Sequence, residues 1–223
     1  MATRTIHQNL RKNNMGLTLH HLNNSRSVRI LWLLEEAGIP YELVRYQRDE
    51  KTHLAPASLR TIHPLGKSPL IEEDGKIIAE SGAIVEYLIN RHAKHLAPDV
   101  SEAEYIDYLQ WIHFAESSAM LPVLLKIFGE FEKNTGTTLN FLEGYADNEF
   151  EKIFSFLDDM LSAKEFIVGN KLSGADIMLG FVINTVVERL VPRERFPNIQ
   201  RYSKCLKNLP SWRKVQDIES RTE

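Results

Sequence analysis

The chain has 223 residues, of which 43% are hydrophobic, so it is long enough for one large domain or two small ones with real cores. Its 27 basic and 30 acidic side chains give a net charge of −3, which argues against a nucleic-acid-binding surface. The one cysteine excludes an intrachain disulfide and a cysteine-based metal cluster and fits a reducing cytoplasm, and no apolar run reaches the roughly 18 residues of a membrane span.

The N-terminal half predicts alternating strands and helices. Residues 1–16 are polar and lack the apolar centre of a signal peptide, so we interpret them as a loose extension. The pattern then predicts a strand over 17–22, a polar turn over 23–27, a helix over 28–37 that ends at Gly38, and a strand over 41–46. Because a helix joins these two strands, we expect them to be parallel.

The next stretch contains a proline at the head of a strand. A charged loop over 47–56 and a short helix over 57–62 lead into Leu65-Gly66-Lys67-Ser68-Pro69. Proline cannot donate to a strand ladder, so Pro69 belongs at a strand start or an edge. If its peptide bond is cis, the backbone of Ser68 faces outward with unpaired amide groups.

A hairpin and a helix follow this proline. Two apolar runs flank Asp74-Gly75, which predicts a hairpin, and a helix begins at Ser81. The order β-α-β-α-β-β-α over residues 17–92 predicts a small α/β domain. The Ser68 backbone and the helix start at Ser81 can share one edge, and a free strand edge beside a helix N-terminus suits a small anionic peptide.

The C-terminal half predicts only helices. After a linker over 93–100, residues 101–223 contain no convincing strand, so we expect an all-α domain there. The expected elements are a long helix opened by a capping box at Ser101 and Glu104 and interrupted at Pro122, a helix over 139–161, a second box at Ser173 and Asp176 before an apolar helix over 177–190, a helix over 197–209, and a short charged tail from Trp212.

Together these residues resemble the cytosolic glutathione S-transferases. Four features follow the order of that family between about Leu17 and Trp212: Ser25 after the first strand, Gly66-Lys67-Ser68-Pro69, Glu80-Ser81, and Ser173-x-x-Asp176. Residues 21–46 and Ile62-His63-Pro64-Leu65-Gly66 are most similar to the bacterial and fungal branch that includes the yeast Gtt-type enzymes. The resemblance implies a thioredoxin-like N-terminal domain, an all-α helical C-terminal domain and a homodimer. It also implies glutathione on the first domain and an electrophile pocket between the two domains.

The turn over residues 23–27 is the candidate for activating glutathione. The thiol is a weak nucleophile and, with an ordinary pKa of about 8.5, is mostly protonated at neutral pH. A helix N-terminus and one hydroxyl or amide donor lower that pKa by stabilising the thiolate. We assign Ser25 as this donor and keep Asn24 as the alternative; the plainer interpretation is that Ser25 or Ser27 only caps the helix.

The residue types missing from this turn also carry information. No tyrosine lies there, which argues against the tyrosine-using classes of the family. No cysteine lies there either, which argues against thiol exchange through an enzyme cysteine.

The resemblance assigns further residues to the rest of glutathione. The backbone of Ser68, before Pro69, pairs with the cysteinyl part as an added strand would. Glu80 and Ser81 receive the ammonium and carboxylate of the γ-glutamyl end, although simple helix capping is the plainer alternative. Lys67 reaches the glycyl carboxylate, and His53 is a weaker candidate because exposed loop residues are usually only solvated.

Two residues of the long helix and the histidines complete the set of candidates. We assign Tyr108 and His113 to the electrophile pocket, although aromatic residues at helical spacing are more often core. The histidines form no metal-binding pattern, because His20 and His21 point to opposite faces of a strand and His92 and His95 lack a third ligand nearby.

The expected function is a cytoplasmic glutathione transferase that uses glutathione as co-substrate and no metal. It adds the glutathione thiolate to small hydrophobic electrophiles, and hydroperoxide reduction is a further activity open to the same thiolate. The alternative from another class is a non-catalytic glutathione-binding or regulatory module of the same fold. Specialised degradation, such as aromatic ether cleavage or dehalogenation, is a third reading. No nucleic acid or membrane partner is expected.

Overall fold

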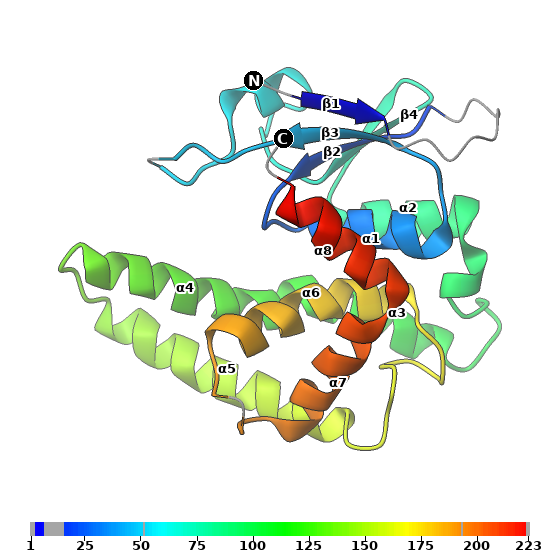
Figure 1. Cartoon of the computed structure of the whole chain (residues 1–223). Helices are drawn as coiled ribbons and strands as arrows, with labels where there is room; N and C mark the ends of the chain where they lie inside the picture. The colour runs from blue at the N-terminus through cyan, green and yellow to red at the C-terminus, as the bar shows by residue number, and fades with distance from the viewer. Residues whose placement is uncertain (1–2, 7–15, 51, 193, 222–223) are drawn as a thin grey trace. The chain divides into compact units, whose positions relative to one another are not determined.

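The computed structural model describes residues 3–6, 16–50, 52–192 and 194–221, and Figure 1 labels its main elements. The chain divides into two compact units. The first unit comprises residues 1–95 and 208–223, and the second unit comprises residues 96–207. This division differs from the expected boundaries at the C-terminal end, because residues 208–223 belong with the N-terminal part of the chain.

The first unit is a mixed sheet with helices. Its strands are β1 (Thr3–Ile6), β2 (Thr18–Leu22), β3 (Glu42–Tyr46), β4 (Leu70–Glu73) and β5 (Lys76–Ala79). Its helices are α1 (Ser27–Ala37), the 3-10 helix η1 (Ala57–Thr61), α2 (Ser81–His92) and α8 (Pro210–Ser220), and the short η2 (Lys94–Leu96) leads into the second unit.

The sheet has the order β1-β3-β2-β4-β5. Strands β2 and β3 run parallel, as predicted, and the other neighbours are antiparallel. Residues 3–6 pair with β3, so this part of the expected loose extension is an edge strand, while residues 7–15 lie outside the described residues. The result is the predicted thioredoxin-like arrangement with one additional strand.

Two turns follow the predicted chemistry. Gly38 ends α1 in the left-handed conformation, with φ of 64°, and its N–H donates to the carbonyl of Leu34. Asp74 and Gly75 join β4 to β5 with φ of 52° and 75°, the pair of positive angles that a tight hairpin of type I′ requires.

The expected charged tail from Trp212 is wrong, because residues 210–220 form α8, which packs against α1 (Figure 1). Trp212 meets Trp32 edge to face at 4.9 Å, and the Trp32 indole N–H donates to Ser211 Oγ at 3.0 Å. The misreading has a physical cause: α8 buries only a narrow stripe of Trp212, Val215 and Ile218 between charged residues.

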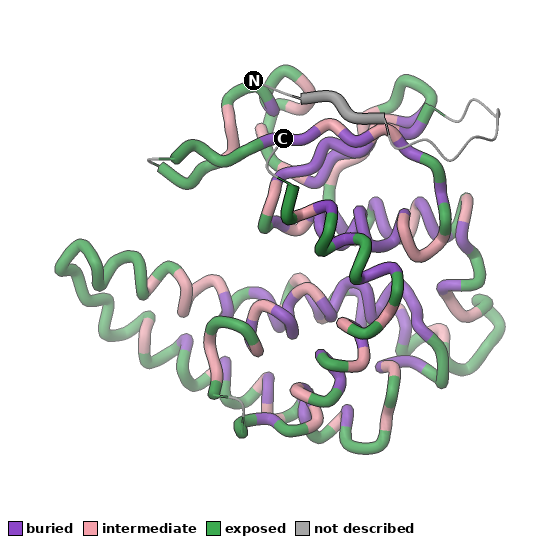
Figure 2. The backbone as a smooth tube through the Cα atoms, in the orientation of Figure 1, coloured by how far each residue is buried: buried purple, intermediate pink, exposed green. Residues whose placement is uncertain are grey.

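The second unit is all-helical, as predicted. It contains α3 (Tyr105–Phe114), the π-helical segment η3 (Ala115–Ala119), α4 (Met120–Asn134), α5 (Asn140–Met160), α6 (Gly174–Arg189) and most of α7 (Pro197–Asn208). Figure 2 shows long buried stretches in α6, whereas the end where α4 meets α5 is exposed.

Helix starts in this unit were predicted unequally well. The capping box at Ser173 and Asp176 is present, but the expected box at Ser101 and Glu104 is wrong. Ser101 Oγ instead donates to Asp99 at 2.6 Å, and α3 begins at Tyr105 without a side-chain cap. The expected interruption near Pro122 takes the form of η3, because proline has no N–H for the preceding turn. None of the helices in the described part of the chain is long and apolar enough to cross a membrane.

Candidate functional site

The turn between β2 and α1 buries the hydroxyl of Ser25. Ser25 is 8% exposed, its Oγ accepts the N–H of Ser27 at 3.2 Å, and its carbonyl accepts the N–H of Val28 at 3.0 Å. These contacts hold the turn that leads into α1, which begins at Ser27 without a side-chain cap. The same Oγ also lies 2.9 Å from Ser27 Oγ, so it belongs to a larger network.

That network continues inward from Ser27 to the last helix of the unit. Ser27 Oγ lies 2.9 Å from Nδ1 of the fully buried His21, and His21 Nε2 is hydrogen-bonded to Glu219 on α8. The second carboxylate oxygen of Glu219 accepts the N–H of Asn24 at 3.0 Å. Asn24 itself is exposed and has φ of 52°. One carboxylate therefore holds both the outer turn and the buried imidazole.

Glu219 is suited to carry a negative charge. Burial alone raises the pKa of this carboxyl, but hydrogen bonds from His21 and Asn24 and the charge of Arg45 bring the pKa below its ordinary value. Arg45 is itself buried and donates to the carbonyls of Ile218 and Arg221, at 2.8 and 3.1 Å, so it also fixes the end of α8.

Ser68 lies beside the C-terminal end of β2. The Ser68–Pro69 peptide bond is cis, and Ser68 Oγ donates to the carbonyl of His20 at 2.9 Å. Leu70 pairs with His20 in the antiparallel ladder, so the residues before Leu70 adjoin the residues that follow His20. The structure thus brings Ser68 to the same edge of the sheet as the turn over residues 23–27.

The start of α2 lies at this edge as well. Ala79 pairs with Leu70, so Glu80 and Ser81 follow the strand where the Pro69 loop precedes it. Ser81 is buried, and its Oγ accepts a hydrogen bond from the buried guanidinium of Arg29 at 3.0 Å. Glu80 has φ of 69° and ψ of 116°, a conformation that side chains rarely adopt and that clusters at functional sites.

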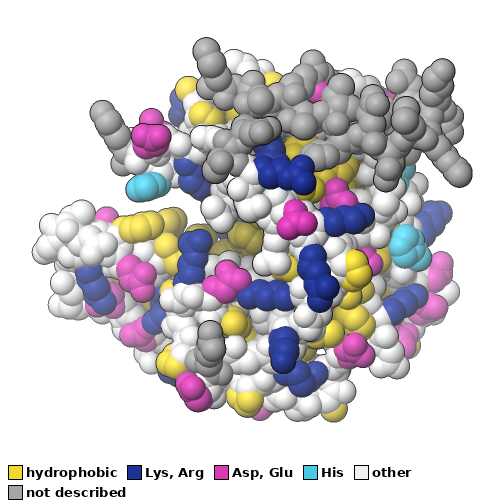
Figure 3. All heavy atoms as spheres, viewed as in Figure 1, with side chains coloured by type: hydrophobic (Ala, Val, Ile, Leu, Met, Phe, Trp, Pro, Cys, Tyr) yellow, Lys and Arg dark blue, Asp and Glu magenta, His cyan; other side chains and the backbone are white. Residues whose placement is uncertain are grey.

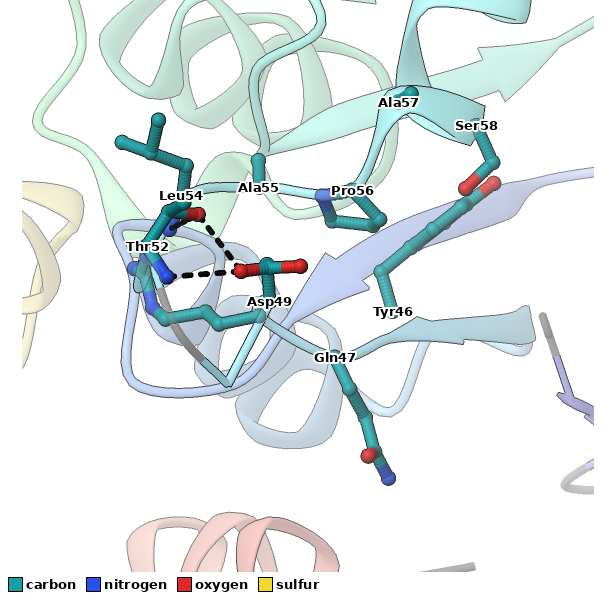
Figure 4. A pocket seen from close by; sticks show the side chains of 10 residues that line it. Tyr46, Gln47, Asp49, Thr52, Leu54, Ala55, Pro56, Ala57 and Ser58 are labelled. Carbon is teal, nitrogen blue, oxygen red and sulfur yellow. Dashed lines mark hydrogen bonds between the residues drawn. The ribbon is translucent and has the colours of Figure 1, made fainter.

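Residues between Tyr46 and Ser58, including the loop over residues 47–56, line an open surface pocket of ≈ 480 Å³ (Figure 4). Asp49 accepts hydrogen bonds from the N–H and hydroxyl of Thr52, at 2.8 and 3.0 Å, and the Tyr46 ring extends toward Ser58. Arg48 donates to the carbonyls of His53 and Asn24, at 3.1 and 3.3 Å, and so ties this loop to the turn before α1. Burial lowers the pKa of Arg48 from its ordinary value.

The two candidates for the glycyl carboxylate are both exposed. Lys67 precedes Ser68 directly, whereas His53 lies at the tip of the 47–56 loop with φ of 56°. Lys67 is therefore next to Ser68 because the two residues are consecutive. The link between His53 and the turn runs through Arg48, which donates to the carbonyls of His53 and Asn24.

The side chains of His20 and His21 alternate across β2 as predicted. His20 Nδ1 lies 2.9 Å from the Tyr46 hydroxyl, in a small core with Leu22 and Leu70, and burial lowers the pKa of His20. Within the described residues, no group of three or more histidine, cysteine, aspartate or glutamate side chains is arranged to hold a metal ion.

The residues assigned to the electrophile do not come together. Tyr108 is buried and stacks on Tyr105, with ring centroids 6.3 Å apart, whereas His113 is exposed. Five residues along a helix correspond to a rotation of about 140°, so the two side chains leave α3 in different directions.

Four residues of the network at this edge did not enter the predicted site: His21, Ser27, Arg29 and Glu219. Arg29 had a signal, since it is a charged residue inside an apolar helical stripe. Ser27 was visible only as a cap, and His21 only as half of a histidine pair. Glu219 had no local signal, because its partners lie at the other end of the sequence.

Comparisons with known proteins agree with this architecture. The glutathione S-transferase N-terminal domain model matches residues 15–90, and the C-terminal domain model matches residues 142–210. Glutathione S-transferase 3 of Schizosaccharomyces pombe is 31% identical over 90% of this chain and 88% of its own length. Glutathione S-transferase 1 of Saccharomyces cerevisiae is 32% identical over 88% of this chain and 92% of its own length.

A solved structure has the same fold. A glutathione S-transferase from Actinobacillus pleuropneumoniae superposes with a TM-score of 0.81 and 32% identity, covering 91% of this chain and 92% of that one. The chain therefore belongs to the cytosolic glutathione S-transferase family and is of the fungal and bacterial Gtt-like type.

Proposed function

We propose that this protein is a glutathione transferase that adds the thiolate of glutathione to small hydrophobic electrophiles. One observation carries the proposal: the buried hydroxyl of Ser25, the edge at Ser68 and the helix start at Ser81 meet at one edge of the sheet. A hydroxyl donor, a strand edge and a helix N-terminus are complementary to the thiol, the backbone and the α-carboxylate of one tripeptide.

Each part of glutathione has a partner in this proposal. The Ser25 hydroxyl donates to the sulfur, with Asn24 as the alternative donor. The backbone of Ser68, set by Pro69, pairs with the cysteinyl residue. Ser81 and the α2 N-terminus bind the γ-glutamyl carboxylate, and Glu80 binds its ammonium group. Lys67, and more weakly His53, reaches the glycyl carboxylate.

The thiolate then attacks the electrophile. A sulfur lone pair forms the new bond to the electrophilic carbon, and the leaving group departs with its electron pair. Tyr108 and His113 of α3 are the residues predicted to contact the electrophile, but they leave the helix in different directions, so one small electrophile would meet at most one of them. The same thiolate can reduce a hydroperoxide. The single cysteine supports a cytoplasmic location.

Exposed apolar side chains support a homodimer. Eight large ones lie between residues 121 and 156, on or beside the two helices of the α4–α5 hairpin, and Figure 3 shows yellow side chains gathered there. They are Leu121, Phe128, Phe131, Leu139, Phe141, Leu142, Tyr145 and Phe156. Many large apolar side chains exposed on one part of a protein usually mark an interface.

The test combines binding with turnover. We expect the purified protein to be retained on immobilised glutathione, to elute with free glutathione, and to conjugate glutathione to a generic aryl halide. Retention without conjugation would point instead to the non-catalytic module. If the protein is neither retained nor active, the enzyme proposal fails.

A further inference from the structure

A continuous chain of hydrogen bonds leads from Ser25 into the interior of the first unit. It runs from Ser25 Oγ to Ser27 Oγ at 2.9 Å, from Ser27 Oγ to His21 Nδ1 at 2.9 Å, and from His21 Nε2 to Glu219. His21 and Ser27 have no exposed surface, so water does not compete along this path. The contact between the Ser27 N–H and Ser25 Oγ is enough to hold the turn before α1, so none of these three links is needed for that purpose.

The donors and acceptors along the chain have one consistent assignment for neutral His21. A carboxylate only accepts, so His21 Nε2 carries a proton toward Glu219 and Nδ1 holds a lone pair. Ser27 therefore donates to Nδ1, and Ser25 donates to Ser27. The lone pairs of the Ser25 oxygen are left for the N–H of Ser27 and for a donor at the outer edge.

The contacts of Ser27 also accommodate His21 as an imidazolium. Nδ1 then donates to Ser27 Oγ, and the Ser27 hydroxyl has the carbonyl of Leu22 as a second acceptor at 2.9 Å. The N–H of Leu22 donates to the same oxygen at 3.1 Å in both states. Both lone pairs of Ser27 are then occupied, so Ser25 no longer needs to donate inward.

Resting on the proposed function, we infer that His21 takes up the proton of the glutathione thiol through Ser25 and Ser27, and that Glu219 stabilises the resulting imidazolium. The proposed function needs only a donor to the sulfur. His21 is in addition the group that receives the thiol proton. His21 and Glu219 touch no substrate, so they are positioning and proton-holding residues that act through Ser25.

The transfer balances without any other reagent. The thiol proton passes to Ser25 Oγ as the Ser25 proton passes to Ser27 Oγ and the Ser27 proton passes to His21 Nδ1. The sulfur keeps the electron pair of the broken S–H bond and becomes the thiolate. The proton now on Ser25 faces the sulfur and donates to it. The charge on His21 is matched by the charge on Glu219.

Three arginines near this chain donate hydrogen bonds to other groups. Arg45, the neighbour of His21 on β3, donates to the end of α8, and Arg48 donates to Asn24 from the 47–56 loop. Arg29 on α1 reaches Ser81. Glu219 is thus the acceptor that the described structure gives to the imidazole, and its loss would remove the carboxylate that is hydrogen-bonded to the imidazolium.

The decisive variant is Glu219→Gln, with Asp217→Asn as the matched control. His21 and Asn24 bond to different oxygens of Glu219, and a glutamine replaces one of these oxygens by an NH₂ group, so one of the two contacts is lost. Asp217 lies on the same helix, is exposed and removes the same charge when changed to asparagine. The readouts are the ultraviolet absorbance of bound thiolate against pH, referenced to the S-methylglutathione complex, and the pH profile of kcat/KM.

We expect the thiolate midpoint of Glu219→Gln to rise by about one pH unit, which means about tenfold less thiolate and tenfold lower kcat/KM below both midpoints. The variant and wild type should converge at high pH, where the thiol ionises without help. Asp217→Asn should follow the wild type throughout. An unchanged midpoint, or an equal loss of kcat/KM at every pH, would overturn the inference while leaving the transferase proposal intact. An inactive wild type that does not bind glutathione would overturn both.

A measurement on the wild type covers the case in which Glu219→Gln does not fold. The imidazole NMR signals of His21 should shift to those of the imidazolium when glutathione binds but not when S-methylglutathione binds. The same response to both ligands would contradict the proton transfer.

Discussion

Two helices of this protein begin at a serine hydrogen-bond network, α1 at Ser25 and α6 at Ser173, and the two networks end differently. At α6, the fully buried Asp176 accepts from Ile167 N, Ser173 N and Ser173 Oγ, each at 2.8 Å, and from the Tyr202 hydroxyl at 2.6 Å. Every link closes on the protein itself. At α1, the network closes on Glu219 at one end and reaches the candidate site through Ser25 at the other.

The comparison teaches that the same residue types stabilise a fold where their bonds are complete and support chemistry where one bond is left for a ligand. Burial raises the pKa of Asp176 although four hydrogen bonds oppose the effect, whereas the hydrogen bonds of Glu219 outweigh its burial and lower the pKa. We therefore propose a stability role for the α6 network and a functional role for the α1 network. Four experiments test this distinction.

The largest effect is expected from Asp176→Asn. The asparagine side chain turns an NH₂ group toward N–H and O–H groups that now donate to Asp176. These buried donors lose their acceptor. Each Asp176 oxygen accepts from two donors, so either amide orientation leaves two donors unpaired. We expect the free energy of unfolding, measured by urea denaturation, to fall by about 1 to 3 kcal/mol for each of these two donors. The control is Asp159→Asn. Asp159 is exposed, so this change should leave the free energy of unfolding nearly unchanged. A stable Asp176→Asn protein would mean that the α6 network is not structural.

Ser25→Ala should reduce activity rather than stability. A hydrogen bond to a charged group contributes about 1.5 to 3 kcal/mol, which corresponds to roughly a 10- to 100-fold loss in kcat/KM for conjugation. Retention on immobilised glutathione should persist. Asn24→Gly is the companion variant, because glycine tolerates the φ of 52° at this position. A larger loss in Asn24→Gly than in Ser25→Ala would transfer the donor role to Asn24.

The two carboxylates should respond to acid with opposite signs. The pKa of Glu219 is lowered by folding, so its contribution to stability is present above the ordinary glutamate pKa and is lost as pH falls through the folded-state value. The pKa of Asp176 is raised, so its titration favours the native state at low pH, and this is lost as pH rises through the folded-state value.

Urea denaturation between pH 7 and pH 3 measures this contrast. The stability gap between wild type and Glu219→Gln should narrow as pH falls, and the gap for Asp176→Asn should widen. If both stability gaps narrowed or both widened as pH falls, the opposite pKa shifts of the two carboxylates would be contradicted.

The smallest effect is expected at the exposed end of the candidate site. Lys67→Ala should raise the KM for glutathione by about two- to fivefold with little change in kcat, because exposed ion pairs are weak. His53→Ala should change KM less, since His53 is further along the chain from the Ser68 edge. The reverse order, measured by steady-state kinetics, would assign the glycyl carboxylate to the 47–56 loop.

The sequence predicted the parts of this structure that depend on local chemistry. The helix that ends at Gly38, the Asp74-Gly75 hairpin and the Ser173 box all have their determinants within a few residues, and all are present. The strand alternation of His20 and His21 was also local. The family resemblance then supplied the order of the site residues.

The parts that were missed depend on contacts between distant segments. The α8 helix looked like a charged tail because its buried stripe is narrow, and only its packing on α1 makes it a helix of the first unit. Ser101 and Glu104 had the spacing of a capping box, but Asp99 competes for the Ser101 hydroxyl. The link between His21 and Glu219 joins two ends of the sequence, and no pattern within a short window indicates it.

The position of α8 has a consequence for how the protein is made. The first unit is encoded in two pieces, and residues 96–207 of the second unit are synthesised between them. While the ribosome still holds the second piece, the nascent glutathione-binding unit has an exposed Trp32 and a His21 without its carboxylate. A chain interrupted anywhere between Ser81 and Glu219 would carry the residues proposed to bind the tripeptide and still lack the carboxylate that is hydrogen-bonded to His21.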